Sequence, residues 1–126
     1  TWDAVKSSLT KQARICVIGS QLGTKGSPHG ADYSASKAAL STWARSLAQS
    51  LAPEGKRVNV VAQGFVDTDI LAGDSPQKRA NREKEVPLKR IGTPEDIAGV
   101  VSFLVGDKSS YITGAVIHVN GGLYLP

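Results

Sequence analysis

The sequence is poor in the residues that build disulfides and metal centres. Its 126 residues include one cysteine, Cys16, two histidines, His29 and His118, and no methionine. A single cysteine excludes an internal disulfide, and the histidines stand apart from each other and from Cys16, so no metal site is predicted. Cys16 lies in an apolar run, where a buried structural thiol is expected rather than a reactive one.

Long hydrophobic runs are also missing. No apolar run approaches the roughly 20 residues that a membrane-spanning helix needs, and no signal-peptide pattern opens the chain. The basic residues are scattered and do not alternate with aromatic ones, so a net charge of +4 predicts neither a nucleic-acid nor a membrane partner. We expect a protein of the cytoplasm or of an organelle matrix. Because the sequence starts at Thr1 and lacks methionine, we also expect residues upstream of it.

The residues that are present predict alternating strands and helices. Continuous apolar runs, typical of parallel strands covered on both faces, predict strands at 14–19, 57–63 and 115–119. Helical spacing predicts helices at 1–12, 32–52 and 72–85, and Thr93-Pro94-Glu95-Asp96 is a helix start. On the long helix we expect the sheet-facing stripe to be Leu40, Trp43, Leu47 and Leu51. This order predicts an α/β fold with right-handed crossovers.

The segment Ser20–Lys37 carries the candidate chemistry. Tyr33 and Lys37 are one helical turn apart and share a helix face, while Ser20 ends the first strand, where open parallel sheets bind ligands. An ammonium about 4 Å from a phenolate stabilises it by roughly 4 kcal/mol at an effective dielectric near 20. Tyr33 could therefore protonate a carbonyl oxygen that Ser20 holds. The Tyr33–Lys37 pair alone is equally compatible with a surface tyrosine and a solvated lysine.

Ser20, Tyr33 and Lys37 in this order, with IGSQLG at 18–23 and NVVAQGFVDTD at 59–69, resemble the short-chain dehydrogenase/reductase family. The resemblance implies the C-terminal half of a doubly wound, Rossmann-type α/β domain, with Ser20, Tyr33 and Lys37 catalytic. It implies a nicotinamide cofactor, NADP or else NAD, bound by Tyr33, Lys37, Gly64, the backbone of Val66 and the hydroxyl of Thr68. The family usually has proline before this glycine, and Gln63 here should loosen the loop.

Within the family, the same segments and the closing YITG (111–114) and HVNGG (118–122) are most similar to the 3-oxoacyl-[acyl-carrier-protein] reductases. That similarity implies reduction of a 3-oxoacyl thioester on acyl carrier protein in fatty acid biosynthesis. Action on another small ketone or alcohol stays open. The family also implies a homo-oligomer, a dimer or a tetramer, to which the long helix would contribute; its small residues could instead pack within one subunit.

The resemblance covers nearly the whole chain but only the second half of the family's domain. We therefore interpret residues 1–126 as one domain, the C-terminal catalytic portion, with the nucleotide-binding half upstream of Thr1. An alternative follows from the first strand, whose apolar edge would be left open without upstream strands. On this hypothesis the 126-residue chain is a non-catalytic fragment or an interaction subunit.

Overall fold

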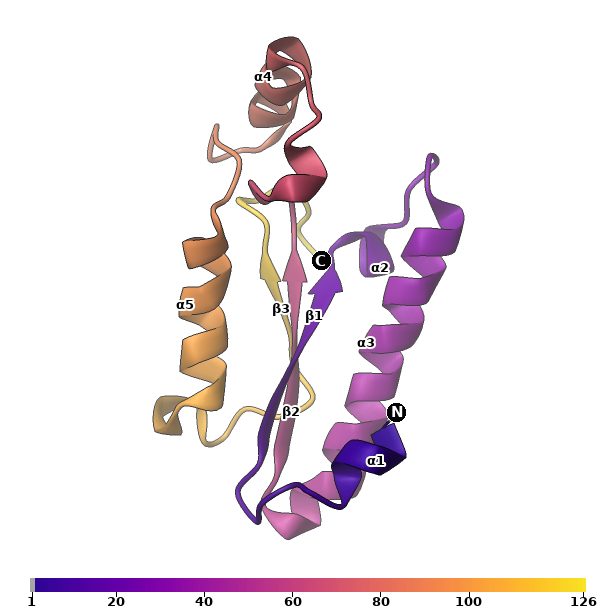
Figure 1. Cartoon of the computed structure of the whole chain (residues 1–126), viewed down its shortest axis with the longest axis vertical. Coiled ribbons are helices and arrows are strands. Elements are labelled where there is room, and N and C mark those ends of the chain that lie inside the picture. Colours follow the sequence, from indigo (N-terminus) through magenta and orange to yellow (C-terminus); the bar gives the residue numbers. More distant parts are fainter. Residues whose placement is uncertain (1) are drawn as a thin grey trace.

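The computed structural model describes residues 2–126 and centres on a three-stranded parallel sheet (Figure 1). The strands are β1 (Arg14–Ser20), β2 (Arg57–Gln63) and β3 (Val116–Val119), in the order β1-β2-β3. In the register, Ser20 lies opposite Gln63, and Gln63 lies opposite Val119. β2 is central, which explains why all its residues except Gln63 are buried. The predicted parallel α/β fold is confirmed.

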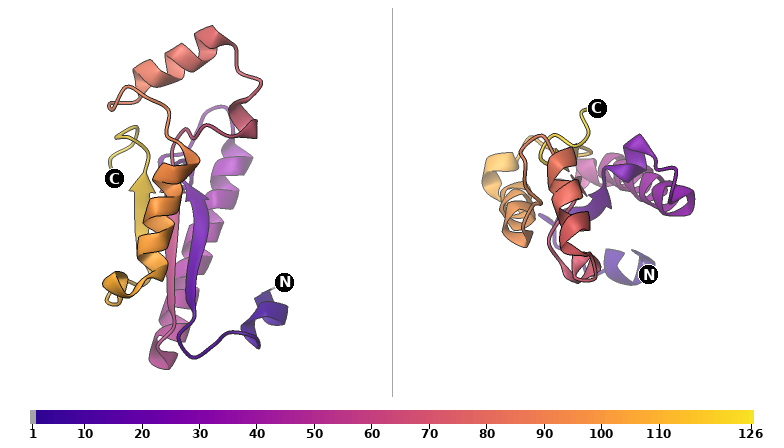
Figure 2. Two further views of the ribbon diagram at one scale, coloured as in Figure 1. Left: turned by 60° about the vertical axis from the view of Figure 1, so that its left-hand side comes forward. Right: turned by 90° about the horizontal axis from the view of Figure 1, so that it is seen from above.

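Two helices sandwich the sheet. α3 (Ala31–Leu51) covers one face and α5 (Pro94–Val105) the other, as the two views of Figure 2 also show. α1 (Trp2–Lys6) precedes β1, and α2 (Leu22–Lys25) lies between β1 and α3. α4 (Pro76–Glu85) lies between β2 and α5 and stands beyond the carboxyl ends of the strands. Short 3-10 turns occupy Ala52–Glu54, Asp69–Leu71 and Asp107–Ser109. No helix within residues 2–126 combines the length and apolarity needed to cross a bilayer.

The prediction for the sheet-facing stripe of α3 was wrong in part. The buried residues of α3 are small ones followed by one leucine: Ser34, Ser41, Ala44, Ala48 and Leu51. Leu51 belongs to the predicted stripe, whereas Trp43 is 40% exposed and contacts Trp2 edge-to-face at 5.6 Å. Leu47, also predicted, is partly buried and packs against the same core as Leu51. Small side chains let the rest of the helix lie close to the β-branched residues of β2.

β1 is less covered than a central strand. Ile18 is 42% exposed and Cys16 is only half-buried, so the expectations of a strand covered on both faces and of a fully buried thiol were wrong. Partial burial still raises the pKa of the Cys16 thiol. The physical reason is position: within the described residues β1 pairs with β2 alone and forms an edge of the sheet.

Several element boundaries differ from the predictions. The first helix ends at Lys6, and its predicted first residue, Thr1, lies outside the described residues. No element was predicted between the first strand and the long helix, but α2 forms there and ends where Gly26 takes φ +77°. α4 begins only at Pro76, because the Ser75 side chain accepts a hydrogen bond from the Lys78 backbone N–H and caps the helix there.

Arg57 fixes α5 against the sheet. Its guanidinium is buried and donates hydrogen bonds to the carbonyl oxygens of Leu104, Gly106 and Ile112 and to Ser109 Oγ, at 2.9 to 3.2 Å. A cation at the C-terminus of a helix interacts favourably with the helix dipole and with its last carbonyl groups. The register of β2 is thereby tied to the position of α5.

Candidate active site

The carboxyl ends of the strands converge on a cavity of about 560 Å³. Ser20 ends β1, the loop after β2 contributes Gly64 to Thr68, and the first turn of α3 contributes Tyr33. Of the site residues predicted from the sequence, the cavity is lined by Ser20, Tyr33, Gly64, Val66 and Thr68. The parallel sheet brings these residues together because both strands end at the same edge.

Tyr33 and Lys37 lie on the side of α3 that faces β1. Tyr33 is 45% exposed and borders the cavity, while Lys37 Nζ lies 5.6 Å from the centre of the Tyr33 ring. Lys37 is not among the cavity-lining residues; its ammonium donates a hydrogen bond to the Ile18 carbonyl oxygen at 3.3 Å. Lys37 therefore lies beside the Tyr33 ring but outside the cavity lining, and its hydrogen bond to the β1 backbone holds its positive charge near that ring.

Ser20 is buried and anchored. Ser20 is only 7% exposed, and its Oγ accepts a hydrogen bond from the Leu22 backbone N–H at 3.2 Å. Because the hydroxyl acts as an acceptor in that bond, its hydrogen is free to be donated to an oxygen in the cavity. The next residue is held as well, since the Gln21 N–H bonds the Gln63 carbonyl oxygen at 3.0 Å.

The loop after β2 presents backbone groups to the cavity. An isolated parallel bridge joins Val66 to Gly92: the Asp67 N–H bonds the Gly92 carbonyl at 2.8 Å, and the Gly92 N–H bonds the Phe65 carbonyl at 3.0 Å. Among residues 2–126 the Val66 N–H has no such partner, and Val66 lines the cavity. Thr68 begins the Asp69–Leu71 turn, and its Oγ1 lies 3.5 Å from the Val66 carbonyl oxygen.

Some residues at the site were not predicted. Gln21 is 3% exposed, and its Oε1 accepts a hydrogen bond from Asn120 Nδ2 at 3.0 Å, which ties the residue after β1 to the C-terminal turn. Arg82 and Glu85 of α4 also line the cavity. For Arg82 and Glu85 the sequence offered one signal, the charged character of 72–85, but it did not show which of these side chains face the cavity. His29 is exposed and borders the same cavity.

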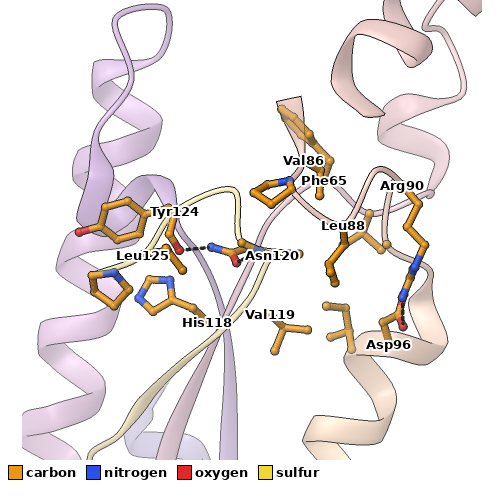
Figure 3. Close-up of a pocket in the computed structure, with 17 residues that line it drawn as sticks. Phe65, Val86, Leu88, Arg90, Asp96, His118, Val119, Asn120, Tyr124 and Leu125 are labelled. Atoms are coloured by element: carbon orange, nitrogen blue, oxygen red, sulfur yellow. Dashed lines mark hydrogen bonds and ion pairs between the residues drawn. The ribbon is translucent and has the colours of Figure 1, made fainter. Parts of the chain in front are cut away.

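A second cavity, of about 570 Å³, lies between the end of β3, the C-terminal tail and the start of α5 (Figure 3). It shares Phe65 and Val66 with the first cavity but is lined by none of the predicted catalytic residues. His118 borders it, with its ring 5.4 Å from that of Tyr124 and with Nδ1 buried and unpartnered within the described chain. Desolvation lowers the pKa of His118.

The chain is similar to known proteins over nearly its whole length. Residues 1–124 match the model of a protein family described as enoyl-(acyl carrier protein) reductase. The 3-oxoacyl-[acyl-carrier-protein] reductase FabG of Salmonella typhimurium is 44% identical over 124 residues, 97% of this chain and 51% of that protein. FabG of Escherichia coli is 44% identical over 115 residues, 91% of this chain and 47% of that protein.

The chain belongs to the short-chain dehydrogenase/reductase family. A solved short-chain dehydrogenase/reductase from Brucella melitensis, titled glucose/ribitol dehydrogenase, superimposes with a TM-score of 0.91 at 32% identity. The match covers 98% of this chain and 50% of that one. This short-chain dehydrogenase/reductase chain thus spans about half the length of the curated relatives it matches.

Proposed function

We propose that the protein reduces a ketone to a secondary alcohol with a nicotinamide cofactor, NADP or else NAD. The observation that carries the proposal is the convergence of Ser20 and Tyr33 on one cavity, with Lys37 Nζ 5.6 Å from the Tyr33 ring. The bound reduced nicotinamide would supply the hydride. The two reductases compared above, which share 44% identity with the chain, support the same reaction class.

In this proposal each side chain has one task. Ser20 donates its hydroxyl hydrogen to the carbonyl oxygen and orients the substrate. Tyr33 donates its phenolic proton to the same oxygen as negative charge develops there. Lys37, held by the Ile18 carbonyl, stabilises the phenolate that remains on Tyr33. Partial exposure of Tyr33 suits its task, since the proton has to be replaced from solvent after each turnover.

The residues present fit the nicotinamide end of such a cofactor. A carboxamide both donates and accepts hydrogen bonds, and the unpaired Val66 N–H offers it a donor at the cavity wall. The Thr68 hydroxyl lies beside that position, 3.5 Å from the Val66 carbonyl. Tyr33, which lines the cavity, and Lys37, whose Nζ lies 5.6 Å from the centre of the Tyr33 ring, would hold the nicotinamide ribose. Gly64 completes the loop, and Gln63 stands where the family usually has proline.

The substrate we propose is a 3-oxoacyl thioester carried by acyl carrier protein, as named for the relatives. The net charge of +4 suits an acidic carrier. We also propose a homo-oligomer, in which the exposed flank of α3 contributes to the contact, and a cytoplasmic location in keeping with the bacterial relatives. The family description names an enoyl reductase, so carbon–carbon double-bond reduction is the competing reaction. The two compared relatives are named 3-oxoacyl reductases, which favours the ketone.

Tyr33→Phe in the intact protein tests the proposal. General acid catalysis contributes roughly 10²- to 10⁴-fold, so kcat for acetoacetyl thioesters should fall by about that factor. Because the Tyr33 side chain is 45% exposed and its hydroxyl donates no bond within the described residues, the melting temperature should stay unchanged.

Two comparisons make the result decisive. Crotonyl thioesters, which offer a double bond in place of the ketone, should be turned over poorly by the wild type. Tyr111→Phe, which removes the hydroxyl of a fully exposed tyrosine, should leave kcat unchanged. Turnover of the ketone by Tyr33→Phe at the wild-type rate would contradict the proposal.

A further inference from the structure

Arg82 is the cation that α4 contributes to the wall of the candidate active site. α4 (Pro76–Glu85) buries none of its residues, so it is not held by an apolar face. Arg82 nevertheless has a side chain only 22% exposed and lines the cavity that contains Ser20 and Tyr33. The solubility of a polar helix does not require one of its arginines to line the cavity, so the position of Arg82 suggests a function.

The guanidinium of Arg82 is fixed in place but not fully used. Its Nε donates to Asp74 Oδ2 at 2.6 Å, and its plane lies over the Phe65 ring, with Cζ 4.5 Å from the ring centre. Within residues 2–126 no acceptor bonds its two Nη atoms. The Phe65 ring contacts the face of the guanidinium, and Asp74 occupies its Nε. The N–H groups on the two Nη atoms therefore remain to bind carboxylate or phosphate oxygens, which arginine recognises through this planar, forked arrangement of donors.

The charge balance around Arg82 is positive. Asp74, whose carboxyl is 6% exposed, is shared with Lys78, so two cations meet one carboxylate there. Lys25 borders the cavity from the other wall. Glu85 also lines the cavity, but it is exposed, and water screens its charge more than that of the partly buried Arg82.

We infer that Arg82 is a specificity-determining residue that binds an anionic oxygen group, carboxylate or phosphate, on the ketone substrate. The inference rests on the proposed function, since it takes this cavity to hold the ketone. The anionic group can belong to a small oxo acid or to the phosphate-bearing arm of a thioester carrier. Both sources offer the same oxygen acceptors to the Nη atoms.

Binding to the intact protein, measured by calorimetry with oxidised NADP present so that no turnover occurs, tests the inference. The probes are oxo acids of increasing length, 4-oxopentanoate to 6-oxoheptanoate, each paired with its methyl ester. The wild type should bind at least one acid roughly tenfold or more tightly than its ester, as expected for a charge-assisted hydrogen bond. To test recognition of phosphate, the affinity for acetoacetyl-coenzyme A is compared with that for the neutral thioester acetoacetyl-N-acetylcysteamine.

Three variants isolate the role of Arg82. Arg82→Met should abolish the preference for the anion while leaving ester binding unchanged, and Asp74 keeps Lys78 as its partner. Arg82→Lys should restore part of the preference, because it keeps the charge without the fork. Arg79→Met is the matched control: Arg79 lies on the same helix, pairs with Asp67 through both Nη atoms and does not line the cavity, so the preference should persist.

The inference would be overturned if the wild type bound the charged and the neutral probes with equal affinity in both the carboxylate and the phosphate comparison. It would also be overturned if Arg82→Met lost the same affinity for the charged and the neutral probes. Turnover is measured separately with NADPH. If no ketone is reduced but the Arg82-dependent preference is found, the proposed reaction fails and the anion site stands. If ketones are reduced without any anion preference, the proposed function stands and the role of Arg82 is wrong.

Discussion

Single residues at this site are set by how closely the backbone segments approach one another. Gly64 follows β2, and a Cβ added to it would lie 2.8 Å from Asn120 Cβ and 2.9 Å from Asn120 Cα. Because a Cα cannot move without its backbone, only glycine allows the loop after β2 to lie against the turn that follows β3. The approach positions the backbone of Val66 at the cavity.

Gly64→Ala should therefore destabilise the protein by about 1–3 kcal/mol, the usual cost of overpacking, as measured by urea unfolding. Gly99→Ala is the control, because an added Cβ there meets nothing within 4 Å and Gly99 lies inside α5. Replacing a glycine in a helix interior should stabilise by about 0.5–1 kcal/mol. Equal effects of the two substitutions would contradict the assigned packing.

The candidate catalytic residues were predictable from the sequence to a limited degree. Ser20, Tyr33 and Lys37 carried a chemical hypothesis, and the spacing of Tyr33 and Lys37 required only that the segment be helical. Their roles stay a proposal. Arg82 and the Gln21–Asn120 hydrogen bond were not predictable, because residues far apart in the sequence meet there only after the chain has folded.

At the scale of elements, α5 shows how local sequence sets a helix start. The Thr93 side chain accepts a hydrogen bond from the Asp96 backbone N–H, and the Asp96 side chain accepts one from the Thr93 N–H, which forms a capping box. Arg90 adds two hydrogen bonds to the same carboxylate, at 2.6 and 2.9 Å. The start of this helix was predicted from its residues, since all the groups that cap it are neighbours in the sequence.

This cap predicts a pH dependence. The ion pair with Arg90 and the Thr93 N–H hold the pKa of Asp96 well below its ordinary value of 3.8. A carboxyl whose pKa is lowered in the folded state stabilises above its unfolded pKa, and the contribution is lost as the pH falls toward the folded one. The melting temperature of Asp96→Asn should therefore lie below that of the wild type at pH 7, and the gap should narrow from about pH 4 downward.

Asp107→Asn is a control for that measurement, because Asp107 is exposed and pairs with Arg14 outside any cap. The melting temperature of Asp107→Asn should differ little from that of the wild type both at pH 7 and below about pH 4, as is usual for surface ion pairs. A gap for Asp96→Asn that stays constant from pH 7 to pH 3 would show that the ionised carboxylate does not support α5.

At the scale of the whole molecule, the sheet has an exposed apolar edge at β1. Ile18 is 42% exposed, and within residues 2–126 β1 has β2 as its single neighbour. An open edge of this kind is a template for pairing with another strand. The chain matches about half of each relative's length.

The isolated 126-residue chain should accordingly self-associate as its concentration rises, and Ile18→Lys should suppress the association, as measured by sedimentation velocity. Tyr111→Lys adds the same charge at a fully exposed position outside the strands and should leave association unchanged. A wild-type chain that stays monomeric at about 100 µM, a concentration at which exposed strand edges pair, would contradict this account of β1.

The sequence by itself determined the features that depend on neighbouring residues: the strand over 57–63, the long helix to Leu51, the cap at Thr93 and the shared helix face of Tyr33 and Lys37. Only the tertiary structure decided which side of α3 meets the sheet, how exposed β1 is, and which charge of α4 enters the cavity. Hydrogen-bond and turn preferences act over a few residues, whereas burial and direction depend on segments that meet only when the chain folds.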